Sequence, residues 1–232
     1  KEGLSQEEAI NRIFLFDSHG LVTKDREGLT PLKQKFAHEL EPQSTFLDAI
    51  GEVKPTAIVG CAAQAGSFNA YVLSAMARIN ERPIIFALSN PTSRSECTAR
   101  EAYTYTEGKC LFASGSPFPQ VELNGKTFIP RQSNNSYVFP GIGLGLVTAS
   151  PRVVPQSVFL SAAEALSKKV SDEDLENGSL FPSLTKIREV SQSIAAAVAE
   201  ECFTAGVAGV PKPKDLSEAI QAAMYKPVYA QI

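Results

Sequence analysis

TAIVGCAAQAGSF, residues 56–68, is the stretch that decides the fold, because an apolar run leads directly into a glycine-bearing turn. The run shows no apolar–polar alternation, which predicts a strand of a parallel sheet that is buried on both faces. The residues from Ala65 onward predict a helix that continues to about Ile79. A strand, a turn and a helix in this order form the repeating unit of a doubly wound α/β fold.

Further apolar runs along the chain have the same form. Pro83–Leu88 ends at Ser89-Asn90-Pro91, and Cys110–Ala113 ends at Ser-Gly-Ser-Pro. Ile13–Phe16 follows a Glu-rich helical stretch and ends at Asp17-Ser-His-Gly, which predicts half of a βαβ unit. Residues 95–106 and a short segment around 45–51 predict helices between these strands.

The chain changes character in its second half. Asn124-Gly125 predicts the turn of a β-hairpin. Beyond Tyr137, helical spacing of apolar residues recurs in residues 157–170, 184–206 and 215–225. Strands that alternate with helices, followed by helices alone, predict a doubly wound, Rossmann-like parallel sheet with a helical C-terminal extension. We expect the boundary between the two domains after residue 149.

Composition narrows the class of protein. The chain has 232 residues, of which 44% are hydrophobic, and a net charge of −3, so a broadly basic nucleic-acid surface is not expected. No apolar run approaches the length of a membrane span. Four widely spaced cysteines without a CxxC pair favour reduced thiols in the cytoplasm or a matrix-like compartment. The first residue is Lys and lies in a helix-like segment, from which we expect a fragment of a longer protein.

Amide side chains follow the predicted strands at points where ligands collect in open parallel sheets. Asn90 comes directly after one strand, and the pair Asn134-Asn135 precedes a run that can start a helix. Carboxamides both donate and accept hydrogen bonds, which suits a small, oxygen-rich anion. The alternative is that these residues only form turns.

Three motifs in a fixed order resemble the C-terminal half of the malic enzymes: ALSNPTSRSECTAREAY (87–103), FASGSPF (112–118) and QSNNSYVFPGIGLG (132–145). FDSHGLV and KFAHEL precede them, and a helical tail ending in MYKPVY (224–229) follows. The resemblance implies oxidative decarboxylation of malate to pyruvate and CO2 with a nicotinamide cofactor and a divalent cation, Mg or Mn. It also implies that residues 1–149 form a partial NAD(P)-binding Rossmann domain, with residues 150–232 packed on it as the helical extension.

Asp17 is the candidate for binding the cofactor's ribose. The chain lacks a GxGxxG fingerprint, but Asp17 ends a predicted strand that follows a helix, where such folds carry an acidic residue. The alternative is that Asp17 only caps its own turn. By resemblance, Ser18 and Lys33 hold the 2′-phosphate of NADP, which favours NADP over NAD. His19 stands where many NADP-dependent members have a stronger base.

The turn after the 56–60 strand is a second candidate for cofactor binding. The resemblance assigns Gly60, Ala62 and Gly66 to this role, since free N–H groups before a helix attract oxygen atoms. The family usually has two adjacent glycines here, and Ala65 replaces the first. A plain turn between strand and helix is the alternative.

For the substrate, the resemblance assigns Asn90, Asn134 and Asn135 to malate, with Asn90 also near the nicotinamide. Of the pair, Asn135 is the preferred direct ligand, since the other asparagine can cap the following helix. The family's catalytic lysine and tyrosine and its metal-binding carboxylates match no segment of this chain, so we expect no catalytic residue and no metal ligand here, and an inactive fragment.

The resemblance also implies a homo-oligomer, either a dimer or a tetramer. The expected location is the cytoplasm or the mitochondrial matrix. Two other hypotheses are a non-catalytic Rossmann-like binding or regulatory module and a different dehydrogenase.

Overall fold

A computed structural model describes residues 3–226 of the chain. It consists of two compact units, one up to Thr127 and one from Phe128 onward. The domain boundary expected after residue 149 falls within the second unit and stays a prediction. Part of the predicted tail motif, Pro227–Tyr229, lies outside the described residues.

The first unit is built on a parallel sheet of β3 (Ala57–Gly60), β4 (Ile84–Ala87) and β5 (Leu111–Ser114). The register pairs Gly60 with Ala87, and Ala87 with Ser114. The three apolar runs therefore end side by side, and the turns that follow them share one edge of the sheet. The predicted α/β architecture is confirmed.

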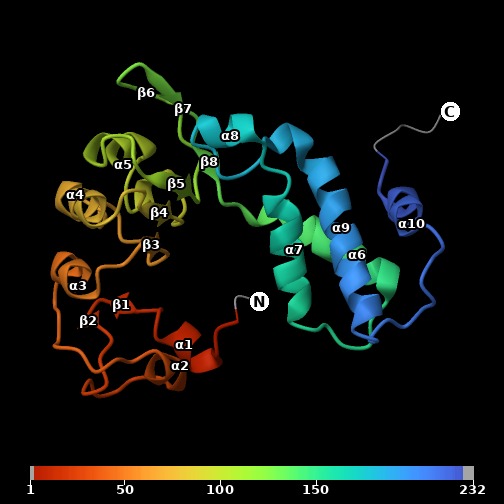
Figure 1. Cartoon of the computed structure of the whole chain (residues 1–232), viewed down its shortest axis with the longest axis horizontal. Coiled ribbons are helices and arrows are strands. Elements are labelled where there is room, and N and C mark those ends of the chain that lie inside the picture. The colour runs from red at the N-terminus through yellow and green to blue at the C-terminus, as the bar shows by residue number, and fades with distance from the viewer. Residues whose placement is uncertain (1–2, 227–232) are drawn as a thin grey trace. The chain divides into compact units, whose positions relative to one another are not determined.

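Three helices, α3 (Phe46–Val53), α4 (Ala70–Ile79) and α5 (Ala99–Tyr105), lie in a row along one side of this sheet (Figure 1). Thr45 caps α3 at the start of its predicted segment, and Thr98 caps α5, so the helix predicted over residues 95–106 begins at Ala99. The helix α4 begins later than predicted. The side chain of Asn69 accepts hydrogen bonds from the N–H groups of Tyr71 and Val72, and this cap fixes the start at Ala70.

The burial of β3 corrects the prediction of a strand buried on both faces. Ile58 is buried, whereas the side chain of Val59 on the opposite face is 57% exposed. Among residues 3–226, the helices α3, α4 and α5 lie along one side of the strand (Figure 1), and the opposite face with Val59 stays exposed. The lack of alternation was therefore a wrong guide to burial at this strand.

The first segment of the chain also differs from its prediction. After α1 (Gln6–Ile10), the chain forms a two-residue antiparallel pair, β1 (Phe16–Asp17) with β2 (Gly20–Leu21), instead of a strand over residues 13–16. Gly20 has φ +102°, and a Cβ at this position would lie 2.3 Å from the carbonyl oxygen of Gln43. Only glycine fits at this position of the tight turn, which reverses the chain so that β2 pairs with β1.

The remaining part of the first unit contains a short helix and a hairpin. The helix α2 (Pro31–Lys35) was not predicted; Thr30 caps it, and Pro31 occupies its first position. The predicted hairpin is confirmed as β6 (Val121–Leu123) and β7 (Lys126–Phe128). Its turn residues Asn124 and Gly125 both have positive φ, as a tight hairpin turn requires.

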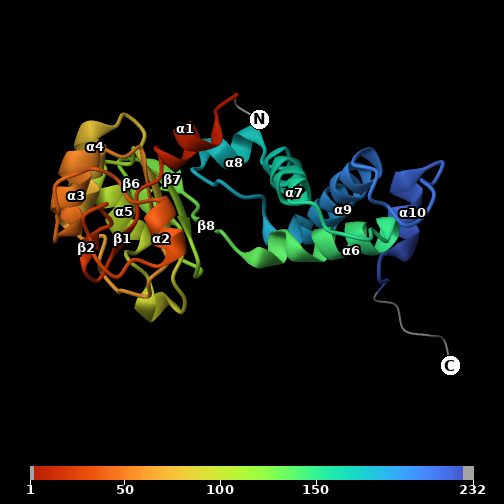
Figure 2. The ribbon, with the colours of Figure 1, turned by 90° about the horizontal axis from the view of Figure 1, so that it is seen from below.

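The second unit is mainly helical. In chain order it contains β8 (Arg131–Gln132), η2 (Asn135–Tyr137), α6 (Phe139–Ala149), α7 (Ser157–Ser167), α8 (Asp172–Glu176), η3 (Leu184–Lys186), α9 (Ile187–Thr204) and α10 (Leu216–Ala223). The helix α9 packs against both α6 and α7, and α10 packs against α9 and α6 (Figure 2). In the part of the chain described, no helix combines the length and apolar character needed to cross a membrane.

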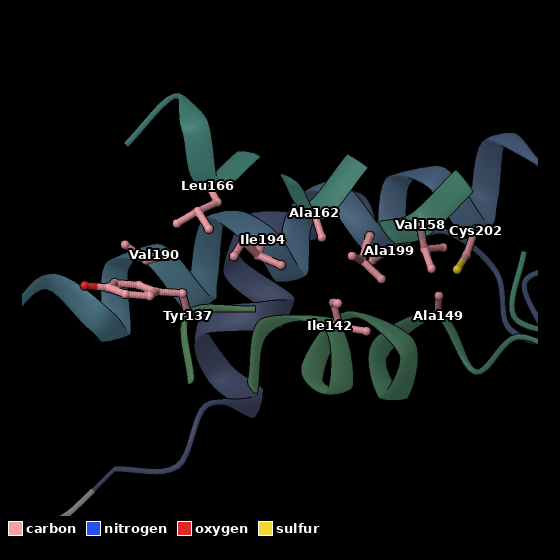
Figure 3. Close-up of a cluster of buried hydrophobic side chains, with 11 residues drawn as sticks. Tyr137, Ile142, Ala149, Val158, Ala162, Leu166, Val190, Ile194, Ala199 and Cys202 are labelled. Atoms are coloured by element: carbon pink, nitrogen blue, oxygen red, sulfur yellow. The ribbon is translucent and has the colours of Figure 1, made fainter. Parts of the chain in front are cut away.

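Side chains from α6, α7 and α9 form the core of the second unit (Figure 3). Ile142, Val158 and Ile194 are among its buried members. Two glycines let α6 and α9 approach closely: a Cβ at Gly141 would lie 2.7 Å from Cβ of Ile194, and one at Gly145 would lie 2.6 Å from the carbonyl oxygen of Ala195. Gly141 and Gly145 of the GIGLG segment therefore serve helix packing.

Candidate functional site

Asp17 lies at the centre of a cluster of charges in the first unit. Nη2 of Arg26 lies 2.7 Å from its Oδ1 and 2.8 Å from its Oδ2, and Nζ of Lys33 donates a hydrogen bond to Oδ2. The backbone N–H of His19 donates to Oδ1 at 2.9 Å. Asp17 thus caps its own turn, which was the alternative interpretation of this residue. It also binds two cationic side chains, Arg26 and Lys33, from other segments.

The cations change the electrostatics of this carboxylate. Desolvation alone would raise the pKa of Asp17, but the hydrogen bonds from Lys33, the His19 N–H and Arg26 outweigh it and hold the pKa well below its usual value of 3.8. Arg26 and Lys33 carry two positive charges against the one negative charge of Asp17. The cluster therefore keeps an excess positive charge at neutral pH.

Arg26 is a residue that reasoning from the sequence missed. Its position nine residues after Asp17, close to Lys24, was the available signal. Arg26 also lines a cavity of about 590 Å³ with Lys24, Glu27, Gly28, Leu29, Gln34 and Ala37. Ser18, predicted beside Asp17, is exposed, and its Oγ lies 3.2 Å from Nδ1 of His19.

Aromatic rings connect this cluster to the turn after β3. The ring centroid of Phe16 lies 5.1 Å from that of Phe46, which stacks at 5.6 Å on Phe68. Phe16 is the neighbour of Asp17, and Phe68 follows Gly66 by two residues. The two segments predicted to bind the cofactor are thus joined through one packed row of side chains.

The residues of the turn after β3 are exposed, but contrary to expectation the N–H groups of Ala63 and Gly66 are not free, since they donate to Ser89 Oγ and to the carbonyl oxygen of Ser95. Ala62 and Gly66 are exposed, and both Ala63 (φ +55°) and Gly66 (φ +70°) adopt the left-handed conformation. Gly60, in contrast, is buried. A Cβ on Gly60 would lie 2.4 Å from Cγ of Glu96, so glycine is required here for packing against Glu96.

Glu96 and Ser89 form a buried polar network beneath this turn, and neither was predicted. Ser89 Oγ accepts a hydrogen bond from the Ala63 N–H at 2.9 Å and donates to Oε1 of Glu96. The Ser89 N–H donates to the other carboxylate oxygen at 3.3 Å. Glu96 is 1% exposed, which its polar sequence neighbourhood, SRSE, gave no signal to expect.

Asn90 is exposed at the end of β4, where the prediction placed it. Oδ1 of Asn90 accepts a hydrogen bond from Ser116 Oγ at 2.8 Å, and Nδ2 lies 3.4 Å from the carbonyl oxygen of Leu88. A Cβ on Gly115 would lie 2.1 Å from that same oxygen. The turn after β5 therefore packs on Asn90 and orients its carboxamide, which retains a second N–H for a ligand.

The predicted asparagine pair lies in the second unit. Oδ1 of Asn134 accepts a hydrogen bond from the Ser136 N–H at 2.9 Å and caps η2. The expectation that one asparagine of the pair caps the following helix is thus confirmed for Asn134. Asn135 is exposed. Whether the pair binds a ligand together with Asn90 stays a prediction.

The side chains that could hold a metal ion are dispersed. Among residues 3–226, no group of three or more His, Cys, Asp and Glu side chains has an arrangement that could bind one. Asp17 is already paired with two cations, and Glu96 is held by Ser89. These carboxylates do not fit a metal site by themselves.

Comparison with known proteins agrees with this arrangement of sheet and turns. The sequence model of the family described as "Malic enzyme, NAD binding domain" matches residues 1–203. The mitochondrial NAD-dependent malic enzyme of Ascaris suum is 47% identical over the whole chain, and the NADP-dependent malic enzyme of Anas platyrhynchos is 48% identical over 99% of it. The chain spans 36% and 42% of the lengths of these two relatives.

Solved structures share the fold. The malic enzyme of Entamoeba histolytica superposes on 90% of the chain with a TM-score of 0.69 at 21% sequence identity, and the chain covers 40% of it. The sheet and the turns at its edge define a dinucleotide-binding α/β domain. The chain belongs to the malic enzyme family and corresponds to its NAD-binding domain.

Proposed function

We propose that the full-length protein containing this chain converts malate to pyruvate and CO2 with reduction of NADP, and that this chain binds the cofactor and part of the substrate. The proposal rests on family membership and, above all, on the pairing of Arg26 and Lys33 with Asp17. Asn90 is the group from the sheet edge that we assign to the substrate.

The charge cluster favours NADP over NAD. A carboxylate that is free accepts hydrogen bonds from both ribose hydroxyls of NAD, but Asp17 is already bound by two cations. Arg26 and Lys33 offer charge-assisted hydrogen bonds to a 2′-phosphate, and the exposed hydroxyl of Ser18 adds a donor. The relatives themselves give no preference, since NAD- and NADP-dependent enzymes are almost equally similar to the chain.

The turn after β3 is the proposed contact with the rest of the dinucleotide. Ala62 and Gly66 belong to this turn, and their exposure leaves room for a ligand; Gly60 is the last residue of β3, directly before the turn. Gly60 contributes indirectly, because its missing side chain leaves the space that Glu96 occupies.

The asparagines position the substrate instead of moving protons. The free N–H of Asn90 can donate to a carboxylate of malate, and Asn135 and Asn134 are proposed to bind the same substrate. Bound NADP supplies the acceptor for the hydride. The base, the acid and the ligands of Mg or Mn are proposed to come from the remainder of the full-length protein, so this chain alone is expected to be inactive.

The test is malate oxidation by the full-length protein with NADP and NAD in parallel, each with and without manganese. We expect NADPH formation that depends on manganese and a higher kcat/KM with NADP than with NAD. A higher kcat/KM with NAD would contradict the assignment of the charge cluster. Nucleotide binding without turnover under any condition would instead indicate a non-catalytic binding module.

Size-exclusion chromatography with light scattering addresses the proposed dimer or tetramer. Fractionation of the source cells distinguishes the two proposed locations, cytoplasm and mitochondrial matrix.

A further inference from the structure

We infer that Glu96 is a positioning residue for the reaction: its buried carboxylate ties the turn after β3 to the turn after β4 and thereby fixes Asn90 relative to the cofactor-binding turn. The inference rests on the proposed function for its catalytic consequence. Its structural part, the coupling of two turns through one side chain, stands on the hydrogen bonds alone.

The direction of the hydrogen bonds shows why a carboxylate is needed. The hydroxyl of Ser89 has one proton, which it donates to Glu96, and its oxygen accepts the N–H of Ala63. The Ser89 N–H donates to the second oxygen of Glu96. Both donors of Ser89 thus point at Glu96, and only a side chain with two acceptors satisfies both.

Two features show that this network fits closely between the turns. Ala63 has φ +55°, a conformation that costs free energy for a residue with a Cβ and that the bond to Ser89 helps to maintain. Glu96 also lies against Gly60, where any side chain would displace it. The Glu96 side chain thus occupies the space that the missing side chain of Gly60 leaves.

The backbone beside Glu96 reinforces the link but does not replace it. The carbonyl oxygen of Ser95 accepts the Gly66 N–H at 3.2 Å, and that of Glu96 accepts the Phe68 N–H at 3.0 Å. These two backbone bonds hold residues 66–68, which lead into α4. They do not involve the Glu96 side chain, so a change of that side chain leaves them intact. A side-chain variant therefore separates the coupling to Ser89 from the folding of the segment.

The consequence for the reaction follows from sequence adjacency. Ser89 precedes Asn90, so the two bonds from Ser89 to Glu96 fix the peptide that carries the carboxamide. The Asn90 carboxamide is also held at its tip, by Ser116 and by the carbonyl oxygen of Leu88, but neither contact fixes the peptide that carries it. Loosening Ser89 should misplace the substrate's carbon relative to the nicotinamide, and such misplacement lowers kcat more than it weakens binding.

The experiment compares Glu96→Gln with Thr106→Val in the full-length protein. Thr106 is also buried at the end of α5, and its hydroxyl donates to the Ala102 carbonyl oxygen and accepts the Cys110 N–H, partners that belong to neither turn. We expect Glu96→Gln to lower kcat about tenfold while changing the KM for NADP by less than about twofold. Thr106→Val should lower the melting temperature and leave kcat and KM at their wild-type values.

Hydrogen exchange provides a readout that does not depend on activity. Glu96→Gln should raise amide exchange about tenfold in both residues 61–68 and residues 88–91, whereas Thr106→Val should leave both segments unchanged. If the wild type turns over no malate, the proposed function fails, and this measurement still decides the coupling. Unchanged exchange in either segment, or raised exchange with wild-type kcat, would overturn the inference.

Ser89→Ala keeps the test decisive if Glu96→Gln does not fold, since it deletes only the hydroxyl at the other end of the same bond. Because the Ser89 N–H still donates to Glu96 in Ser89→Ala, adding Glu96→Gln should lower kcat further, but by less than Glu96→Gln lowers it in the wild type. Fully additive losses would show that Glu96 does not act through Ser89.

Discussion

The guanidinium of Arg26 reaches across nine residues of sequence to Asp17, with Nη2 at 2.7 Å from Oδ1 and 2.8 Å from Oδ2. Together with Lys33, it turns the residue expected to bind a ribose into the centre of a net positive cluster. We expect this cluster to select NADP over NAD through the 2′-phosphate.

Replacement of Lys33 by Gln should raise the KM for NADP about tenfold in the full-length protein, because a charge-assisted bond to the 2′-phosphate is lost. The KM for NAD, which lacks this phosphate, should stay within about twofold of its wild-type value. Steady-state kinetics with both nucleotides checks this. Lys35→Gln, in the same helix, is the matched control and should affect neither. Equal effects of Lys33→Gln on both nucleotides would remove the 2′-phosphate argument.

Asn90→Ala should reduce turnover of malate roughly 10- to 100-fold, because the carboxamide that Ser116 orients no longer holds the substrate. The dissociation constant for NADP should change much less, since the charge cluster at Asp17 remains intact. Initial rates and fluorescence titration with NADPH measure the two quantities. Wild-type turnover in this variant would refute the substrate role of Asn90.

The ion pairs of Asp17 should make stability depend on pH. The pKa of Asp17 lies below its ordinary value of 3.8 in the folded chain, so its contribution is present above that pH and is lost as the pH falls towards the lower folded value. Asp17→Asn should therefore lower the melting temperature at pH 7, and the gap to wild type should close in acid. Glu39→Gln, at an exposed pair with Lys24, is the control and should change the free energy of unfolding by less than about 0.5 kcal/mol.

Two glycines of α6 should respond oppositely to substitution. Gly145→Ala places a Cβ 2.6 Å from the Ala195 carbonyl oxygen and should destabilise the second unit by about 1–3 kcal/mol. A Cβ on Gly143 meets no atom within 4 Å, so Gly143→Ala should stabilise the helix by about 0.5–1 kcal/mol. Urea denaturation of both variants checks this. A destabilised Gly143→Ala would contradict the packing of α6.

Alkylation should distinguish the cysteines. Cys61 is exposed in the turn after β3, whereas Cys97, Cys110 and Cys202 are buried. Burial raises the pKa of the Cys110 thiol to about 12, which further lowers its reactivity. Iodoacetamide followed by mass spectrometry should modify Cys61 well before the other three in the folded protein. Unfolding in urea should make all four react, and early labelling of Cys110 would contradict its burial.

Local sequence signals predicted much of the fold. The apolar runs ending at polar turns predicted β4 and β5, and the segments around 45–51 and over 95–106 predicted α3 and α5. These signals succeed because a cap or a strand end is defined by residues a few positions apart. The predictions for the extent of the first strand and for the burial of Val59 were wrong. The pairing of a strand and the covering of its faces depend on segments far along the chain.

The apolar strand and glycine turn at residues 56–68 were enough to determine a parallel α/β sheet and the edge at which its ligands are expected. Which polar groups meet beneath that edge was decided only by the tertiary structure. The strand register brings Ala63, Ser89 and Glu96 together, and a tight reversal at Gly20 accompanies the pairing of Asp17 with Arg26. The sequence of one turn does not indicate which other turn it contacts. Hydrogen bonds between turns depend on how the whole sheet is assembled.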